Sequence, residues 1–234
     1  MLAVTDLNAW YGRSHVLQGI DLTVRRGEIV SLIGRNGAGK TTTLRTIMGL
    51  ITRRSGRVEF EGVDILSLPV HHRHRLGIGF VPEDRRIVAG LSVRENLRLG
   101  MLADVGRRHA AAFMVSLGDL FPRLVERHDQ PAETLSGGEQ QMLAIARAFA
   151  AAPKLMILDE PSEGIMPVLV NDMFELFGRM RRDGVTVLLV EQNVERALSI
   201  SDRAYIIDQG MIVHQGDALE LLANTAIQER YCAV

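Results

Sequence analysis

Three short and almost continuous apolar runs stand out along the chain, at residues 28–33, 155–158 and 186–190. Such runs are typical of strands in a parallel sheet whose two faces are both covered by helices. Segments with helical spacing lie next to these runs, at residues 41–50, 139–152 and 168–182. This alternation of strands and helices predicts an α/β fold.

Other regions break the alternation of strand and helix. Residues 2–30 and 56–65 carry shorter alternating runs, which predict antiparallel strands joined by turns. From about residue 91 to 152 helical spacing replaces the strand signals, so we expect a helical insertion there. Residues 204–213 predict a β-hairpin with its turn at 209–210.

Composition narrows the class of protein. The 234 residues include 47% apolar ones, enough for one large domain or for one domain with inserted subdomains. The formal net charge of -1 gives no basic excess of the kind that nucleic acid requires, so we expect no nucleic-acid partner. A single cysteine, Cys232, cannot form an internal disulfide, which favours a reducing compartment.

The N-terminal segment lacks a basic stretch followed by an apolar one, so we expect no signal peptide. No apolar run approaches the roughly 20 residues that span a bilayer. We therefore expect any membrane association to come through a partner protein.

A glycine-rich motif follows the first predicted strand. Residues 34–41 match the pattern G-x-x-x-x-G-K-[ST], in which backbone N–H groups and a helix N-terminus converge on phosphate oxygens. Lys40, one of only two lysines in the chain, would reach the β- and γ-phosphates, and the Thr41 hydroxyl would bind Mg²⁺. A chance glycine-rich turn is the alternative, but a strand before the motif and a helix after it favour nucleotide binding. The predicted nucleotide-binding residues are Gly34, Asn36, Gly37, Ala38, Gly39, Lys40, Thr41 and Thr42.

Two carboxylates end the second predicted strand. Asp159 and Glu160 follow it directly, and ligands of open α/β sheets bind at the carboxyl ends of strands. Asp159 would therefore hold Mg²⁺, and Glu160 would act as general base toward the attacking water. Alone, such a pair is more often a helix cap or a solvated turn; the glycine-rich motif favours the catalytic interpretation.

A second loop opens onto a helix at Leu135-Ser136-Gly137-Gly138-Glu139. Exposed N–H groups at a helix N-terminus form an anion site. The same letters also predict a simple capping box, with Ser136 as N-cap and Glu139 three residues later, and both interpretations can hold together. A protein with one phosphate loop rarely needs two such devices, unless the second serves a nucleotide bound mainly to another subunit.

These motifs, in this order and at this approximate spacing, resemble those of the ATP-binding cassette ATPases. The resemblance covers the whole chain and implies one cassette domain with a RecA-like P-loop core. Residues 1–83 and 153–234 would form that core with an antiparallel β subdomain, and residues 84–152 an inserted helical subdomain that carries the signature loop. It further implies ATP and Mg²⁺ as ligands and a head-to-tail pair of cassettes. The signature residues that would act on the partner's ATP are Ser136, Gly137, Gly138 and Glu139.

Tyr11 sits where the family places an aromatic ring against adenine, although it could equally be an ordinary turn residue before Gly12.

Two positions depart from the usual pattern. Glu83 stands where the family usually has glutamine, and it could still ligate Mg²⁺ or a water. Gln192 replaces the usual switch histidine; an amide can hydrogen-bond a γ-phosphate but cannot accept a proton as imidazole does, which shifts the weight of catalysis to Glu160.

The stretches at 81–86 and 190–193 are similar to one ATPase subunit of bacterial importers for branched-chain amino acids. Importers for urea and short-chain amides share the pattern, and residues 162–165 are slightly more similar to the ATPases of those importers. The resemblance implies an ATP-hydrolysing motor at the cytoplasmic face of the inner membrane. Its partners would be permease subunits, a second and different cassette, and indirectly a periplasmic solute-binding protein.

An alternative is an ATPase of the same family that acts on nucleic acid or ribosomes. Those relatives usually carry two cassettes or long coiled coils, whereas this chain has one cassette and no heptad run. A P-loop GTPase or kinase would lack a use for residues 135–139, and no N-K-x-D motif is present.

Overall fold

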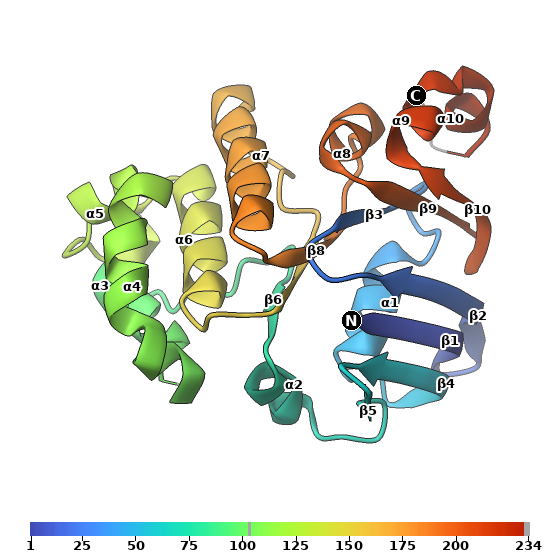
Figure 1. Cartoon of the computed structure of the whole chain (residues 1–234), viewed down its shortest axis with the longest axis horizontal. Helices are drawn as coiled ribbons and strands as arrows, with labels where there is room; N and C mark the ends of the chain where they lie inside the picture. The colour runs from blue at the N-terminus through green and yellow to red at the C-terminus, as the bar shows by residue number, and fades with distance from the viewer. Residues whose placement is uncertain (103, 232–234) are drawn as a thin grey trace.

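A computed structural model describes residues 1–102 and 104–231, so Cys232 lies outside the described residues. Its centre is a six-stranded sheet in the order β10-β9-β3-β8-β7-β6 (Figure 1). Neighbouring strands run parallel except for β10, which pairs antiparallel with β9. The strands are β3 (Ile29–Ile33), β6 (Ile78–Val81), β7 (Leu155–Asp159), β8 (Thr186–Val190), β9 (Arg203–Asp208) and β10 (Met211–Asp217).

Burial on both faces explains the continuous apolar runs of the central strands. Every residue of β3, β7 and β8 is buried. Along β7, Leu155 and Ile157 belong to one hydrophobic cluster, while Met156 and Leu158 belong to another on the opposite face. The three predicted strands and the hairpin turn at 209–210 are confirmed.

Strand β6 escaped prediction. It is only four residues long, follows the short helix α2 (Val70–Leu76) after a single residue, and contains Gly79. A Cβ atom at this glycine would lie 2.8 Å from the sulfur of Met156, so the strand packs closely against β7 and has no side chain at this position to add to the apolar pattern.

A second, antiparallel sheet has the order β2-β1-β4-β5, as the alternating runs predict. Helix α1 lies between the two sheets, because Leu44 and Ile47 share a hydrophobic cluster with Leu17 of one sheet and Leu32 of the other. The elements are β1 (Leu2–Tyr11), β2 (Ser14–Val24), β4 (Arg53–Phe60), β5 (Val63–Asp64) and α1 (Lys40–Ile47).

Most of the remaining helices form one group. Helices α3 to α6 gather at one end of the molecule, and α7 packs between them and the core sheet (Figure 1). This confirms the helical insertion, whose limits of 84–152 stay a prediction. The helices are α3 (Val93–Gly100), α4 (Asp104–Leu120), α5 (Pro122–Glu126), α6 (Gly137–Phe149), α7 (Pro167–Arg182), α8 (Val194–Ile200), α9 (Ala218–Ala223) and α10 (Thr225–Tyr231), with a 3-10 turn at Ala132–Thr134.

Among the described residues, no helix combines the length and the apolar character that crossing a bilayer requires.

Candidate nucleotide-hydrolysis site

The glycine-rich loop joins β3 to α1 at the carboxyl edge of the core sheet. Gly34 has φ of 155°, and a Cβ atom there would lie 2.2 Å from the carbonyl oxygen of Ile207. Gly39, with φ of 114°, precedes the first turn of α1. The free N–H groups of that turn therefore open into the loop, as phosphate binding requires.

Lys40 is almost fully buried in this loop. Its ammonium donates hydrogen bonds to the carbonyl oxygens of Gly34 at 2.9 Å and Arg35 at 3.2 Å. The same nitrogen lies 3.4 Å from the carboxylate of Glu160. A desolvated cation thus faces the loop on one side and the predicted general base on the other.

Thr41 and Asp159 meet directly. The threonine hydroxyl donates to Oδ1 of Asp159 at 2.9 Å, whereas Oδ2 is buried without a hydrogen-bond partner among the described residues. Burial raises the pKa of Asp159 to about 6; the Thr41 bond opposes this effect, and the negative charges of Glu160 and Glu83 add to it. A buried, unpaired carboxylate oxygen beside a hydroxyl suits a hard cation such as Mg²⁺.

Glu160 follows β7 with an unusual backbone. Its φ is 46°, in the left-handed region that non-glycine residues rarely adopt. Its side chain is 8% exposed and lies between two polar partners, Lys40 on Oε1 and Gln192, whose amide donates to Oε2 at 2.5 Å. Residues predicted from three distant segments are therefore brought together.

Glu191 is a buried carboxylate next to this group that the sequence reasoning missed. It is 1% exposed and accepts hydrogen bonds from the backbone N–H of Ser162 at 3.0 Å and from the Ser162 hydroxyl at 2.7 Å. Burial raises the pKa of Glu191, while the Ser162 bonds act in the opposite direction. Its place directly after β8, beside Gln192, was the available signal.

The signature loop starts helix α6 as a capping box. The Ser136 hydroxyl donates to Glu139 at 2.8 Å and accepts from the Glu139 N–H at 3.4 Å. Although burial raises the pKa of Glu139, the Ser136 bonds and the charge of Arg127 lower it overall. No hydrogen bond or ion pair between described residues joins this loop to the phosphate loop. The capping interpretation is confirmed, and the anion site stays a prediction.

Tyr11 ends β1 and is 47% exposed. It pairs with Ser14 across the β1–β2 hairpin, directly before Gly12, whose φ is 58°. Both the adenine-stacking role and the ordinary turn role remain compatible with this position, so the adenine contact stays a prediction.

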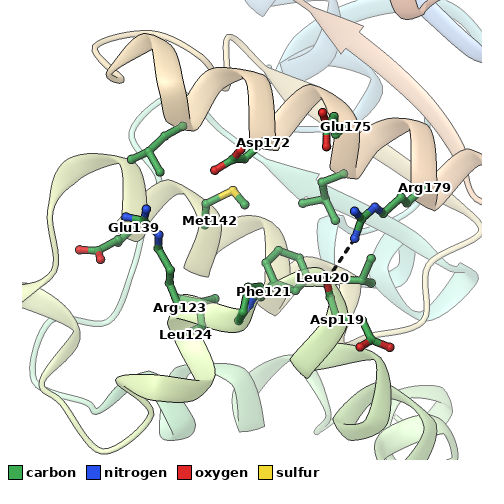
Figure 2. Close-up of a pocket in the computed structure, with 13 residues that line it drawn as sticks. Asp119, Leu120, Phe121, Arg123, Leu124, Glu139, Met142, Asp172, Glu175 and Arg179 are labelled. Carbon is green, nitrogen blue, oxygen red and sulfur yellow. Dashed lines mark hydrogen bonds between the residues drawn. The ribbon is translucent and has the colours of Figure 1, made fainter.

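A separate hollow of about 280 Å³ lies between α5, α6 and α7. Figure 2 shows Asp172, Glu175 and Arg179 on one helix facing the segment around Phe121, with Arg179 donating to the carbonyl of Asp119 at 3.2 Å. Acidic side chains outnumber basic ones in its lining, and it has no glycine-rich backbone. These features do not favour a nucleotide in the hollow, so the phosphate loop stays the predicted nucleotide site.

The family model described as "ABC transporter" matches residues 17–163, more than half of the chain. The chain belongs to the ABC transporter family. This cassette is 43% identical, over 99% of both chains, to the high-affinity branched-chain amino acid transport ATP-binding protein BraG of Pseudomonas aeruginosa. It is 36% identical to the lipopolysaccharide export system ATP-binding protein LptB of Escherichia coli, covering 98% of this chain and 96% of the relative.

The fold also matches those of solved structures over nearly the whole chain. A nucleotide-free ATP-binding cassette from an ABC transporter superposes with a TM-score of 0.85 at 25% identity, over 98% of this chain and 97% of the other. The predictions of an α/β cassette that binds and hydrolyses ATP are thereby confirmed.

Proposed function

We propose that this cassette is the ATP-hydrolysing motor of a bacterial importer for branched-chain amino acids. The observation that carries the hydrolytic part is the convergence of Lys40 and Gln192 on Glu160, beside the unpaired oxygen of Asp159. The identity to BraG over the full length supports the choice of solute.

In this proposal each residue of the site has one task. Lys40 binds the β- and γ-phosphates, and the N–H groups at the start of α1 hold the remaining phosphate oxygens. Glu160 orients the attacking water and accepts its proton. Gln192 holds the Glu160 carboxylate by a hydrogen bond and can donate to the γ-phosphate, but it takes no proton.

Thr41 and Asp159 would hold Mg²⁺. Glu83 lies near enough for its charge to raise the pKa of Asp159, and we propose it as a further carboxylate ligand, directly or through water. The buried Oδ2 of Asp159 supports this assignment, because it has no hydrogen-bond partner in the part of the chain that the structure describes. When bound, the cation supplies positive charge against the phosphate oxygens.

A bacterial ABC transporter cassette that is 25% identical to this chain has a dimeric structure. We propose that Ser136 to Glu139 complete the site of a neighbouring cassette; in support, no hydrogen bond or ion pair between described residues joins them to the phosphate loop of the same chain. The neighbour would be a different subunit, and isolated chains could pair with themselves. Permease subunits would hold the pair at the cytoplasmic face of the inner membrane, where a periplasmic binding protein delivers the solute to the permeases.

The test is to purify the cassette with its permeases from native membrane and measure ATP hydrolysis with solute-loaded binding proteins. We expect leucine-loaded binding protein to stimulate hydrolysis and to drive leucine uptake into vesicles. Stimulation only by a binding protein loaded with urea or a short-chain amide would assign those solutes in place of branched-chain amino acids. The sequence at residues 162–165 favours that alternative. Co-purification with lipopolysaccharide-export partners or with nucleic acid would contradict the proposal.

A further inference from the structure

The left-handed backbone of Glu160 needs contacts that hold it in place. A non-glycine residue in this region costs on the order of 1 kcal/mol or more, and it persists only where its surroundings determine it. One contact is the hydrogen bond from the Glu160 N–H to the carbonyl oxygen of Val190 at 2.9 Å. This bond fixes the start of the loop that follows β7 but not the residues beyond it.

The next fixed point of that loop is Ser162, and its partner is Glu191. One carboxylate oxygen accepts the backbone N–H of Ser162 at 3.0 Å, and the other accepts its hydroxyl at 2.7 Å. The second oxygen also lies 3.3 Å from the N–H of Gln192, which donates to it. Both oxygens of one buried side chain thus join the loop after β7 to the residue that holds the Glu160 carboxylate.

We infer that Glu191 is a positioning residue for ATP hydrolysis: it fixes Ser162 and thereby holds Glu160 in the orientation that hydrolysis requires. The inference rests on the proposed role of Glu160 as general base. One residue beyond Ser162, the Glu163 N–H donates back to the carbonyl of Glu160 at 3.2 Å, which closes a tight turn around both fixed points. Releasing Ser162 would free this turn and let Glu160 relax toward an ordinary backbone conformation.

Glu191→Leu removes both acceptors while keeping an apolar side chain in a buried position. We expect kcat for ATP to fall by roughly 10- to 100-fold, because a small displacement of a catalytic group has such an effect. The KM for ATP should change by less than about threefold, since no phosphate contact is lost. Glu191→Gln should recover part of kcat, because its amide can accept the Ser162 N–H through oxygen and donate to the hydroxyl through nitrogen, although that nitrogen cannot accept the Gln192 N–H.

Two variants control for a general loss of structure. Ser162→Ala removes one of the two bonds and should lower kcat in the same direction but less. Glu195→Leu removes an exposed glutamate four residues along the same segment and should leave kcat and KM unchanged.

Amide hydrogen exchange tests the geometry without relying on turnover. In the full-length folded protein, Glu191→Leu should speed exchange of the Ser162 N–H by at least about tenfold, whereas Glu195→Leu and Glu160→Gln should not. Unchanged exchange at Ser162, or an unaltered kcat in Glu191→Leu, would overturn the inference. Loss of exchange protection together with an active Glu160→Gln variant would instead keep the Glu191 contact and refute the proposed base.

Discussion

Single side chains decide the chemistry of this cassette, and Gln192 is the least conventional of them. Its amide contacts Glu160 at 2.5 Å, where an imidazole would otherwise be able to take up a proton. In the proposed mechanism the amide only orients the carboxylate, so removing it should weaken catalysis without changing which group is the base.

Gln192→Ala should therefore lower kcat for ATP by roughly 10²-fold, the usual effect of losing one preorganised donor. Gln192→Asn keeps the amide on a shorter side chain, so its kcat should lie between that of the wild type and that of Gln192→Ala. Steady-state ATPase assays of the assembled transporter would measure the series. A variant with alanine that keeps wild-type turnover would refute the orienting role.

The sequence predicts the site residues whose chemistry depends on neighbours in the chain. Lys40 belongs to a local pattern, and Asp159 and Glu160 end a recognisable strand. Glu191 is different, because its role depends on Ser162, which is 29 positions away and reaches it only through the parallel pairing of β7 with β8. The place of Glu191 directly after β8 is visible in the sequence, but its contact with Ser162 is not.

At the scale of single elements, capping residues determine where two of the helices begin. Helices α3 and α6 both begin with a capping box, at Ser92 with Glu95 and at Ser136 with Glu139. The start of α6 at Gly137 rather than at the predicted position 139 follows from this cap. The limits of the other predicted helices shift by a few residues because apolar spacing marks the face of a helix and not its end.

The two caps form a matched pair. Ser92→Ala and Ser136→Ala should each lower the free energy of unfolding by about 1 kcal/mol, because each removes an N-cap hydroxyl. Only Ser136→Ala should also reduce ATP turnover, since it alone lies in the proposed signature loop. Denaturant unfolding and ATPase assays on both variants would check this. Equal turnover in the two would argue against the role in trans.

A buried arginine ties helix α1 to the elements beside it. Arg73 is fully buried, and its guanidinium donates to the carbonyl oxygens of Ile47 at 2.8 Å, Leu68 at 2.8 Å and Ile65 at 2.6 Å. Burial lowers the pKa of Arg73 to about 10, so it stays protonated at neutral pH.

Arg73→Met would leave these carbonyls without their donor, and we expect a loss of about 3 kcal/mol in the free energy of unfolding. Arg75 is an exposed arginine of α2, the helix that also contains Arg73. Arg75→Met should change the free energy of unfolding by less than about 0.5 kcal/mol. Denaturant unfolding of both variants measures the difference. Similar values for the two would show that the buried contacts add little.

At the scale of the molecule, one polar cluster joins the two sheets. Arg203 of β9 donates to the Glu28 carboxylate at 2.7 Å and to the carbonyl of Thr23 in β2 at 2.8 Å, and the Thr23 N–H donates to the Tyr205 hydroxyl at 3.0 Å. Although burial raises the pKa of Glu28, the bonds from Arg203 and from the Arg25 N–H lower it overall.

This lowered pKa predicts a dependence of stability on pH. A carboxylate with a lower pKa in the folded state stabilises the protein above its unfolded pKa of 4.5, and that contribution is lost as the pH falls through the folded value. Glu28→Gln should therefore reduce stability at pH 7 but weaken the loss seen on acidification. Urea unfolding between pH 7 and pH 3 measures both slopes; identical slopes would contradict the assignment.

The central claim is that Glu160 is the general base of ATP hydrolysis in this cassette. The most direct measurement is ATP turnover of Glu160→Gln in the assembled transporter, together with the ATP it retains. We predict a fall of roughly 10²- to 10⁴-fold in turnover, with ATP held in a closed pair of cassettes. Turnover close to that of the wild type in a folded, ATP-binding Glu160→Gln variant would contradict the claim.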